Sequence, residues 1–160
     1  MKKAIILLPA IIALLSIGAC KKSTPGFTGA TWSASVNGQS KSGYALVTYT
    51  SELNELSISF FPSANSSSPN MSISTGLQDS VMVHTGIYPL NGPPSEAFYN
   101  IDTTNSVDLV SSYGQLNIIQ LNFKANTISG TFNFSCAPSS STGDSVIVTN
   151  GLVNGGMEGL

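Results

Sequence analysis

Hydrophobic and polar residues alternate along most of the chain beyond residue 28. Trp32, Ala34 and Val36 share one face of an extended segment, and the same alternation recurs at residues 56–60. A period of two is the pattern of a strand with one buried face. Because no segment beyond residue 28 shows the longer period of an amphipathic helix, the pattern predicts an all-β domain.

Gly, Pro, Ser and Asn divide this region into roughly nine to eleven short strands. Asn37-Gly38 is a strong hairpin signal, Asn126 is a second turn residue, and Asn150-Gly151 is expected to turn into a glycine-rich tail. Large side chains at both faces of 116–124 predict a central strand covered on both sides. We expect an antiparallel β-sandwich, since the strand spacing is too uneven to favour a closed up-and-down barrel. The predicted strands are 32–36, 44–50, 56–60, 71–75, 81–84, 87–90, 97–101, 107–111, 116–124, 128–136 and 146–149.

The first twenty residues have the order of a secretory signal. Lys2 and Lys3 precede an apolar run at 4–15 that is too short to span a bilayer stably. The small residues Gly18 and Ala19 before Cys20 resemble the lipobox of bacterial lipoproteins, whose cysteine receives a diacylglycerol and fatty acyl chains such as palmitate. Two or three chains suffice for a stable anchor. The predicted organisation is a helical signal peptide at 1–19, a lipidated cysteine and flexible tether at 20–27, and one all-β domain at 28–160.

Charge and composition narrow the location and the partners. Residues 21–26 contain no acid, whereas surface-exposed Bacteroidota lipoproteins resemble one another in an acidic cluster at this place. We therefore expect an outer-membrane lipoprotein that faces the periplasm. Charged residues are only 9% of the chain, and all six basic residues are lysine, which argues against nucleic-acid partners.

Several segments together resemble a domain-of-unknown-function family of Bacteroidota lipoproteins. They are Gly-Ile-Tyr-Pro-Leu at 86–90, Ala-Phe-Tyr at 97–99, Gly-Gln-Leu-Asn-Ile at 114–118, the strands at 128–134 and 146–151, and the hairpin at 32–38. The resemblance implies an exported all-β lipoprotein without an assigned activity. Cys136 and Leu152 depart from the pattern, which has a small inert residue and an aromatic residue at these places.

The residues that usually carry chemistry are scarce. His84 is the only histidine and is expected at a strand end on the surface, while Cys136 is expected to be buried beside Phe132 and Phe134. A zinc site needs three or four ligands, and a serine hydrolase elbow is absent, so we predict no metal, no cofactor and no enzyme activity. Paired carboxylates could serve glycoside hydrolysis, but the candidates fall in predicted loops or at strand ends. These candidates are Glu52, Glu55, Asp79, Glu96, Asp102, Asp108 and Asp144.

Three triplets, Asp79-Ser80-Val81, Asp102-Thr103-Thr104 and Asp144-Ser145-Val146, resemble the O-glycosylation acceptor motif of exported Bacteroidota proteins. They make Ser80, Thr103 and Ser145 candidate acceptors. The alternative is chance, because Ser and Thr are abundant throughout the chain.

Four aromatic residues near predicted turns, Tyr88, Phe98, Tyr99 and Tyr113, could stack on sugar rings or could cap the ends of the core. The favoured function is a non-catalytic interaction or structural module, tethered to the membrane through Cys20, that docks on an envelope protein or glycan. The alternative is a carbohydrate- or small-ligand-binding domain. A hydrolase would require two carboxylates, or His84 with an acid and a hydroxyl, to converge in one cleft.

Overall fold

The computed structural model describes residues 29–76, 82–102, 107–137 and 145–158, and this part of the chain contains nine strands and no helix. The predicted signal helix at 1–19 and the tether lie outside the described residues. The strands are β1 (Ala30–Val36), β2 (Gln39–Thr50), β3 (Glu55–Phe61), β4 (Met71–Thr75), β5 (Gly86–Pro89), β6 (Ser95–Asp102), β7 (Val107–Asn122), β8 (Thr127–Cys136) and β9 (Val146–Gly156).

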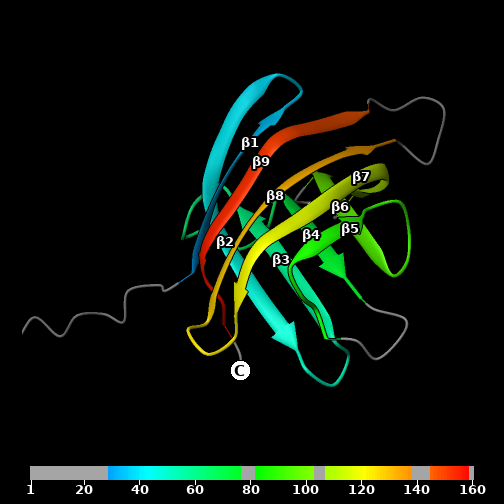
Figure 1. The fold of residues 1–160 in the computed structure, drawn as a ribbon. Coiled ribbons are helices and arrows are strands. Elements are labelled where there is room, and N and C mark those ends of the chain that lie inside the picture. Colours follow the sequence, from blue (N-terminus) through cyan, green and yellow to red (C-terminus); the bar gives the residue numbers. More distant parts are fainter. Residues whose placement is uncertain (1–28, 77–81, 103–106, 138–144, 159–160) are drawn as a thin grey trace, which may run out of the picture.

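Eight of these strands close into an antiparallel barrel (Figure 1). Each strand pairs with the next along the chain, except that β4 pairs with β6, and β9 returns to pair with β1. The all-β class is therefore confirmed, whereas the predicted sandwich is wrong. Closure depends on pairs such as Trp32 with Val153, and local alternation carries no information about a partner so distant in the chain.

The long strand β7 has neighbours on both edges. Its first residues pair with β6, its later residues pair with β5 on the same edge, and β8 occupies the other edge. The two strands predicted at 107–111 and 116–124 are thus one strand. Its central position agrees with the prediction, but its faces do not: the register shifts between Ile118 and Gln120, and Ile119 is left 59% exposed. Because the bulge adds one residue, the inward-facing positions change from even to odd numbers, and Leu121 again packs against the core.

A second bulge explains why Asn150-Gly151 does not end the sheet. Asn150 has φ 52°, and the chain continues as β9 to Gly156. The ring of Phe132 lies over Gly151, where a Cβ atom would stand 2.4 Å from a ring carbon. Glycine is required here because the ring occupies the space of a side chain.

The other two predicted turns are confirmed, whereas one predicted strand is not. Asn37 and Gly38 both have positive φ, 49° and 80°, as a two-residue type I′ hairpin requires, and Asn126 has φ 51° between β7 and β8. The strand predicted at 81–84 is wrong where the structure describes it. Residues 82–84 are irregular, and their main chain bonds to a side chain instead: the backbone N–H and C=O of His84 both bond to the Tyr88 hydroxyl.

Aromatic side chains from opposite walls fill the middle of the barrel. Trp32 contacts Phe60 edge-on at a centroid distance of 5.6 Å, and Phe60 contacts Phe132 at 4.8 Å. The Trp32 indole also donates a hydrogen bond of 2.9 Å to the carbonyl of Phe61. Eight-stranded barrels are wide enough either to be filled by side chains or to hold one small ligand, and these contacts place the present barrel in the first group.

Because the strands run up and down, their links alternate between two rims. The hairpin rim carries the link at 37–38, shown at the top of Figure 1, and the link at 62–70. The ends of β6 and β8 and the starts of β7 and β9 also lie at this rim. The tether rim carries Gly29, the segments at 51–54 and 82–94, the link at 123–126 and residues 157–158 after β9. Figure 1 shows the 51–54 and 123–126 links at the bottom, beside the C-terminus.

Candidate ligand pocket on the outer face of the barrel

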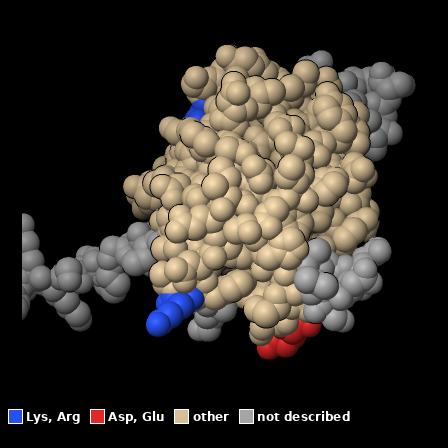
Figure 2. Space-filling model, viewed as in Figure 1, with Lys and Arg blue, Asp and Glu red and all other residues tan. Residues whose placement is uncertain are grey.

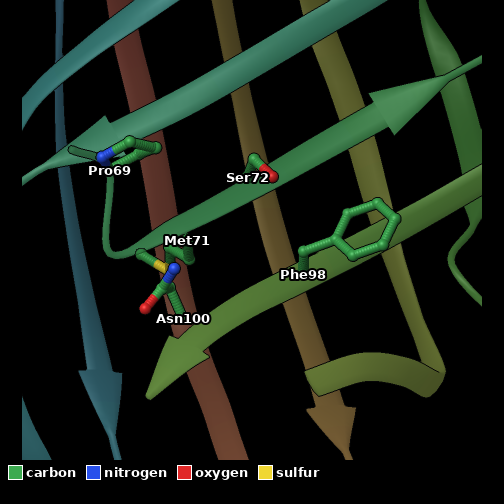
Figure 3. Close-up of a pocket in the computed structure, with 5 residues that line it drawn as sticks. All are labelled: Pro69, Met71, Ser72, Phe98 and Asn100. Carbon is green, nitrogen blue, oxygen red and sulfur yellow. The ribbon is translucent and has the colours of Figure 1, made fainter. Parts of the chain in front are cut away.

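A pocket of about 330 Å³ lies on the outer face of the barrel, where β4 and β6 meet the 62–70 link (Figure 3). It is large enough for one sugar ring or a comparable small ligand. The lining residues are Pro69, Met71, Ser72, Phe98 and Asn100.

Strand pairing decides which side chains reach this pocket. Ser72 pairs with Phe98, and both point outward because their neighbours Ile73 and Ala97 are fully buried. A small serine beside a large phenylalanine leaves a hollow in the surface. Figure 3 shows Ser72 near the middle, with the Phe98 ring on one side and Asn100 on the other.

The Asn100 amide is the most unusual group in the pocket. Its backbone N–H donates a hydrogen bond of 2.8 Å to the carbonyl of Asn70, which fixes the end of β6 against the 62–70 link. Its side-chain Oδ1 is buried and has no hydrogen-bond partner among the described residues. A buried acceptor without a donor costs roughly 1–3 kcal/mol, so a donor supplied by a ligand would recover part of that cost.

The pocket is electrically neutral. None of its lining residues is charged or titratable. The surface seen in Figure 2 is also poor in charge: it shows few lysine and acidic side chains, and these stand apart from one another. Neutral polar ligands therefore fit this surface better than phosphates or carboxylates, which proteins usually bind with arginine or lysine.

The four aromatic residues predicted from the sequence do not form one site. Tyr88 is buried, and both hydrogen-bonding roles of its hydroxyl are satisfied by the His84 main chain. Tyr99 is half-buried and packs against the core, and Tyr113 is 61% exposed on β7. Only Phe98 lines the pocket.

The sequence analysis missed Ser72 and Asn100 as pocket residues. Asn100 follows Phe98 by two positions, so period-two alternation alone places both on one face of β6. The neighbouring strand β4 could not be identified without the register.

The remaining candidate groups stay separate. His84 is exposed, as expected, and its Nδ1 lies 2.6 Å from the carbonyl oxygen of Thr85. Glu55 accepts a hydrogen bond from Ser74, and Glu52 is exposed. Among the described residues, no group of three or more His, Cys, Asp or Glu side chains could hold a metal ion.

Cys136 lies in the core with Phe132 and Phe134, as predicted. Burial raises the pKa of its thiol from 9.0 to about 11, and a hydrogen bond with the Tyr99 backbone opposes part of this rise. The thiol is therefore neutral at ordinary pH and is a poor nucleophile.

Of the three candidate glycosylation acceptors, Ser145 is exposed directly before β9, whereas Ser80 and Thr103 lie outside the described residues. Cys20 also lies outside them. Within the described part of the chain, no helix is long and apolar enough to cross a membrane. Searches of family models, curated proteins and solved structures find no match to this chain.

Proposed function

We propose that this chain is a non-catalytic binding protein of the cell envelope, anchored by acyl chains on Cys20, whose outer pocket binds a neutral sugar ring of an envelope glycan. The observation that carries the proposal is the pocket wall itself, in which Phe98, Ser72 and Asn100 surround an uncharged hollow and the Asn100 Oδ1 has no hydrogen-bond partner among the described residues.

Each of the three side chains would make a different contact with a sugar. The Phe98 ring offers an apolar surface to the C–H face of a sugar, as aromatic residues at binding sites commonly do. The Ser72 hydroxyl and the Asn100 amide both donate and accept hydrogen bonds, which matches the dual character of sugar hydroxyls.

The proposal assigns no catalytic residue. Glycoside hydrolysis uses two carboxyl groups about 5–10 Å apart on either side of the bond, and no carboxylate, histidine or cysteine lines this pocket. The protein would bind and hold its glycan without cleaving it.

The proposed location rests on the sequence. The pattern of lysines, apolar run and small residues before Cys20 supports acylation and export, and the absence of acids in 21–26 supports an outer-membrane position facing the periplasm. Membrane attachment through Cys20 would hold the pocket close to the glycans of the envelope.

The test is titration of the lipidated protein, in detergent, with glycan fragments from the producing cell's envelope. We expect Phe98→Ala to weaken binding roughly tenfold, or about 1–2 kcal/mol, through loss of the stacking surface. Val110→Ala is the matched control, because Val110 pairs with Phe98 on the outer face but does not line the pocket. Equal affinity in both variants, or no binding to any fragment, would refute the proposal.

A second candidate, docking of a partner protein by strand addition, is favoured by one observation. Residues 39–43 of β2 pair with β1 but have no strand neighbour on their other edge within the described part of the chain, because β3 ends at Phe61 before Pro62. An exposed strand edge can receive an extended peptide. Cross-linking in native membranes, followed by mass spectrometry, distinguishes a stoichiometric protein partner from a glycan.

A further inference from the structure

The two rims differ sharply in the residues that form them. The four links of the hairpin rim, at 37–38, 62–70, 103–106 and 137–145, contain no Val, Leu, Ile, Met, Phe, Tyr or Trp. The segments of the tether rim contain many such residues, among them Leu53, Met82, Val83, Leu90 and Phe123. This asymmetry must come either from packing at the tether rim or from what this rim contacts.

Part of the apolar material at the tether rim closes the barrel. Val83, Leu90 and Met157 are buried, and Phe123 packs on Tyr49 at a centroid distance of 4.8 Å. Met157 is held across this end by a 2.8 Å hydrogen bond from its N–H to the carbonyl of Asn126. These residues are explained by packing.

Two further side chains are not explained by packing. Leu53 is 64% exposed in the link between β2 and β3, and Met82 is 55% exposed in the segment before β5. Both come from loops of the same rim, and neither belongs to the hydrophobic core. Single exposed apolar residues are common on protein surfaces, and Ile119 and Leu152 are similarly exposed on the barrel wall. Leu53 and Met82 differ from these because they lie in loops of the rim that carries the tether.

The position of the tether identifies the occupant of this surface. Gly29 bridges to Gly156 at the tether rim and follows Cys20 by nine positions. Nine residues span at most about 30 Å when fully extended. A bilayer that holds Cys20 is therefore always near this rim. The tether also carries Lys21 and Lys22, which suit phosphate headgroups.

We infer that the tether rim rests on the lipid surface, with Leu53 and Met82 inserted at the level of the headgroups and the upper acyl chains. This inference rests on the proposed anchoring through Cys20. Insertion is shallow, because Glu52 stands next to Leu53 and a carboxylate is costly in hydrocarbon. The barrel then stands upright, and the glycan pocket beside the 62–70 link points away from the membrane.

The experiment uses the full lipidated protein, reconstituted in phosphatidylethanolamine–phosphatidylglycerol vesicles, with Cys136→Ala as a common background. Single cysteines replace Leu53 or Met82 at the tether rim, Ser40 beside the hairpin turn, or Leu152 on the barrel wall, and each carries an environment-sensitive fluorophore. Leu152 is the matched control, because it is 53% exposed and apolar but lies within β9 and not in a link of either rim.

We expect labels at 53 and 82 to lose roughly half of their emission to brominated lipid, as shallowly inserted groups do, and labels at 40 and 152 to lose almost none. Quenching at 152 but not at 53 would overturn the upright orientation. Fluorescence changes at 53 that depend on protein density rather than on brominated lipid would assign the surface to a second copy.

Flotation with the vesicles separates the two proposals. If the Cys20→Ala variant floats like the parent, or the purified parent carries no lipid mass, the proposed anchoring fails. If only the acylated protein floats and the labels at 53 and 82 are not quenched, the anchoring stands and the orientation fails.

Discussion

The hairpin rim and the tether rim are built on the same eight strands, yet they follow different rules of composition. Links at the hairpin rim are made of Ser, Asn, Thr, Gly, Pro, Ala and Asp, whereas links at the tether rim also carry large apolar side chains. Since the strands run up and down, the two kinds of link alternate along the chain. If the barrel is oriented as inferred above, the links that meet the membrane are every second link along the chain.

The aromatic layer in the middle of the barrel lies between the two rims. A substitution there should have the largest effect on the free energy of unfolding. Phe132→Ala removes a fully enclosed ring that contacts Phe60 at 4.8 Å and Phe134 at 6.4 Å. We expect a loss of about 3–5 kcal/mol in the free energy of unfolding, since the cavity lies between walls that cannot collapse. Urea unfolding, followed by Trp32 fluorescence and by circular dichroism, measures it.

Phe98→Ala is the control for that substitution, because it removes the same kind of side chain from the outer face of the barrel. We expect it to cost much less stability while it abolishes the stacking surface of the pocket. If the two probes gave separate transitions in Phe132→Ala, the rims would be independent folding units, and the aromatic layer would not couple them.

The next effect compares the rims directly. Met157→Ala at the tether rim removes a buried side chain that closes the barrel, and about 2 kcal/mol or more should be lost. Ser66→Ala at the hairpin rim removes a hydroxyl that forms an exposed hydrogen bond of 3.0 Å with the Ser63 hydroxyl, and stability should change by about 0.5 kcal/mol or less. Thermal unfolding of both variants measures the difference. Equal losses of stability would contradict the view that buried apolar residues close the barrel at the tether rim alone.

The contrast between the rims also shows what the sequence could reveal. Period-two alternation was sufficient to predict most strands and the inward position of Cys136, because both depend on neighbours within a few residues. The Asn37-Gly38 turn was predictable for the same reason. The bulges at Ile119 and Asn150 were not predictable: an apolar residue at 119 gives no sign that a bulge leaves it exposed.

Closure and the pocket depend on distant pairs. Pairing of β1 with β9 decides between sandwich and barrel, and pairing of β4 with β6 brings Ser72 beside Phe98. Neither pair leaves a local signal. The composition of the rims was present in the sequence, but it acquires meaning only when the up-and-down order assigns each link to an end.

A smaller effect concerns two buried hydroxyls at the end of β4 and on β7. The Thr75 Oγ1 has no hydrogen-bond partner among the described residues, whereas the Ser111 hydroxyl accepts a 2.9 Å bond from the backbone N–H of Ala97. Thr75→Val should raise the free energy of unfolding by about 1 kcal/mol, because it replaces an unsatisfied polar atom with a methyl group. Ser111→Ala should lower it by about 1–2 kcal/mol, because it leaves the Ala97 donor unpaired.

Denaturant unfolding of the two variants at one pH tests this pair. Opposite signs are required, since the same kind of atom is removed in each case and only its bonding differs. A loss of stability in Thr75→Val would mean that the Thr75 hydroxyl is satisfied in solution by a group such as buried water.

The last effect lies at the hairpin-rim end of β8, where burial raises the pKa of the Cys136 thiol to about 11. In the unfolded chain this pKa is 9.0, so between these values the unfolded state has lost a proton that the folded state retains. Folding therefore keeps its full stability below about pH 9 and loses some of it as the pH rises towards 11. The urea midpoint of the parent should fall over this range more than that of Cys136→Ala, which has no thiol to ionise. Parallel pH dependence in the two proteins would mean that the thiol ionises as readily in the folded barrel as in the unfolded chain, and that this end of the core admits water.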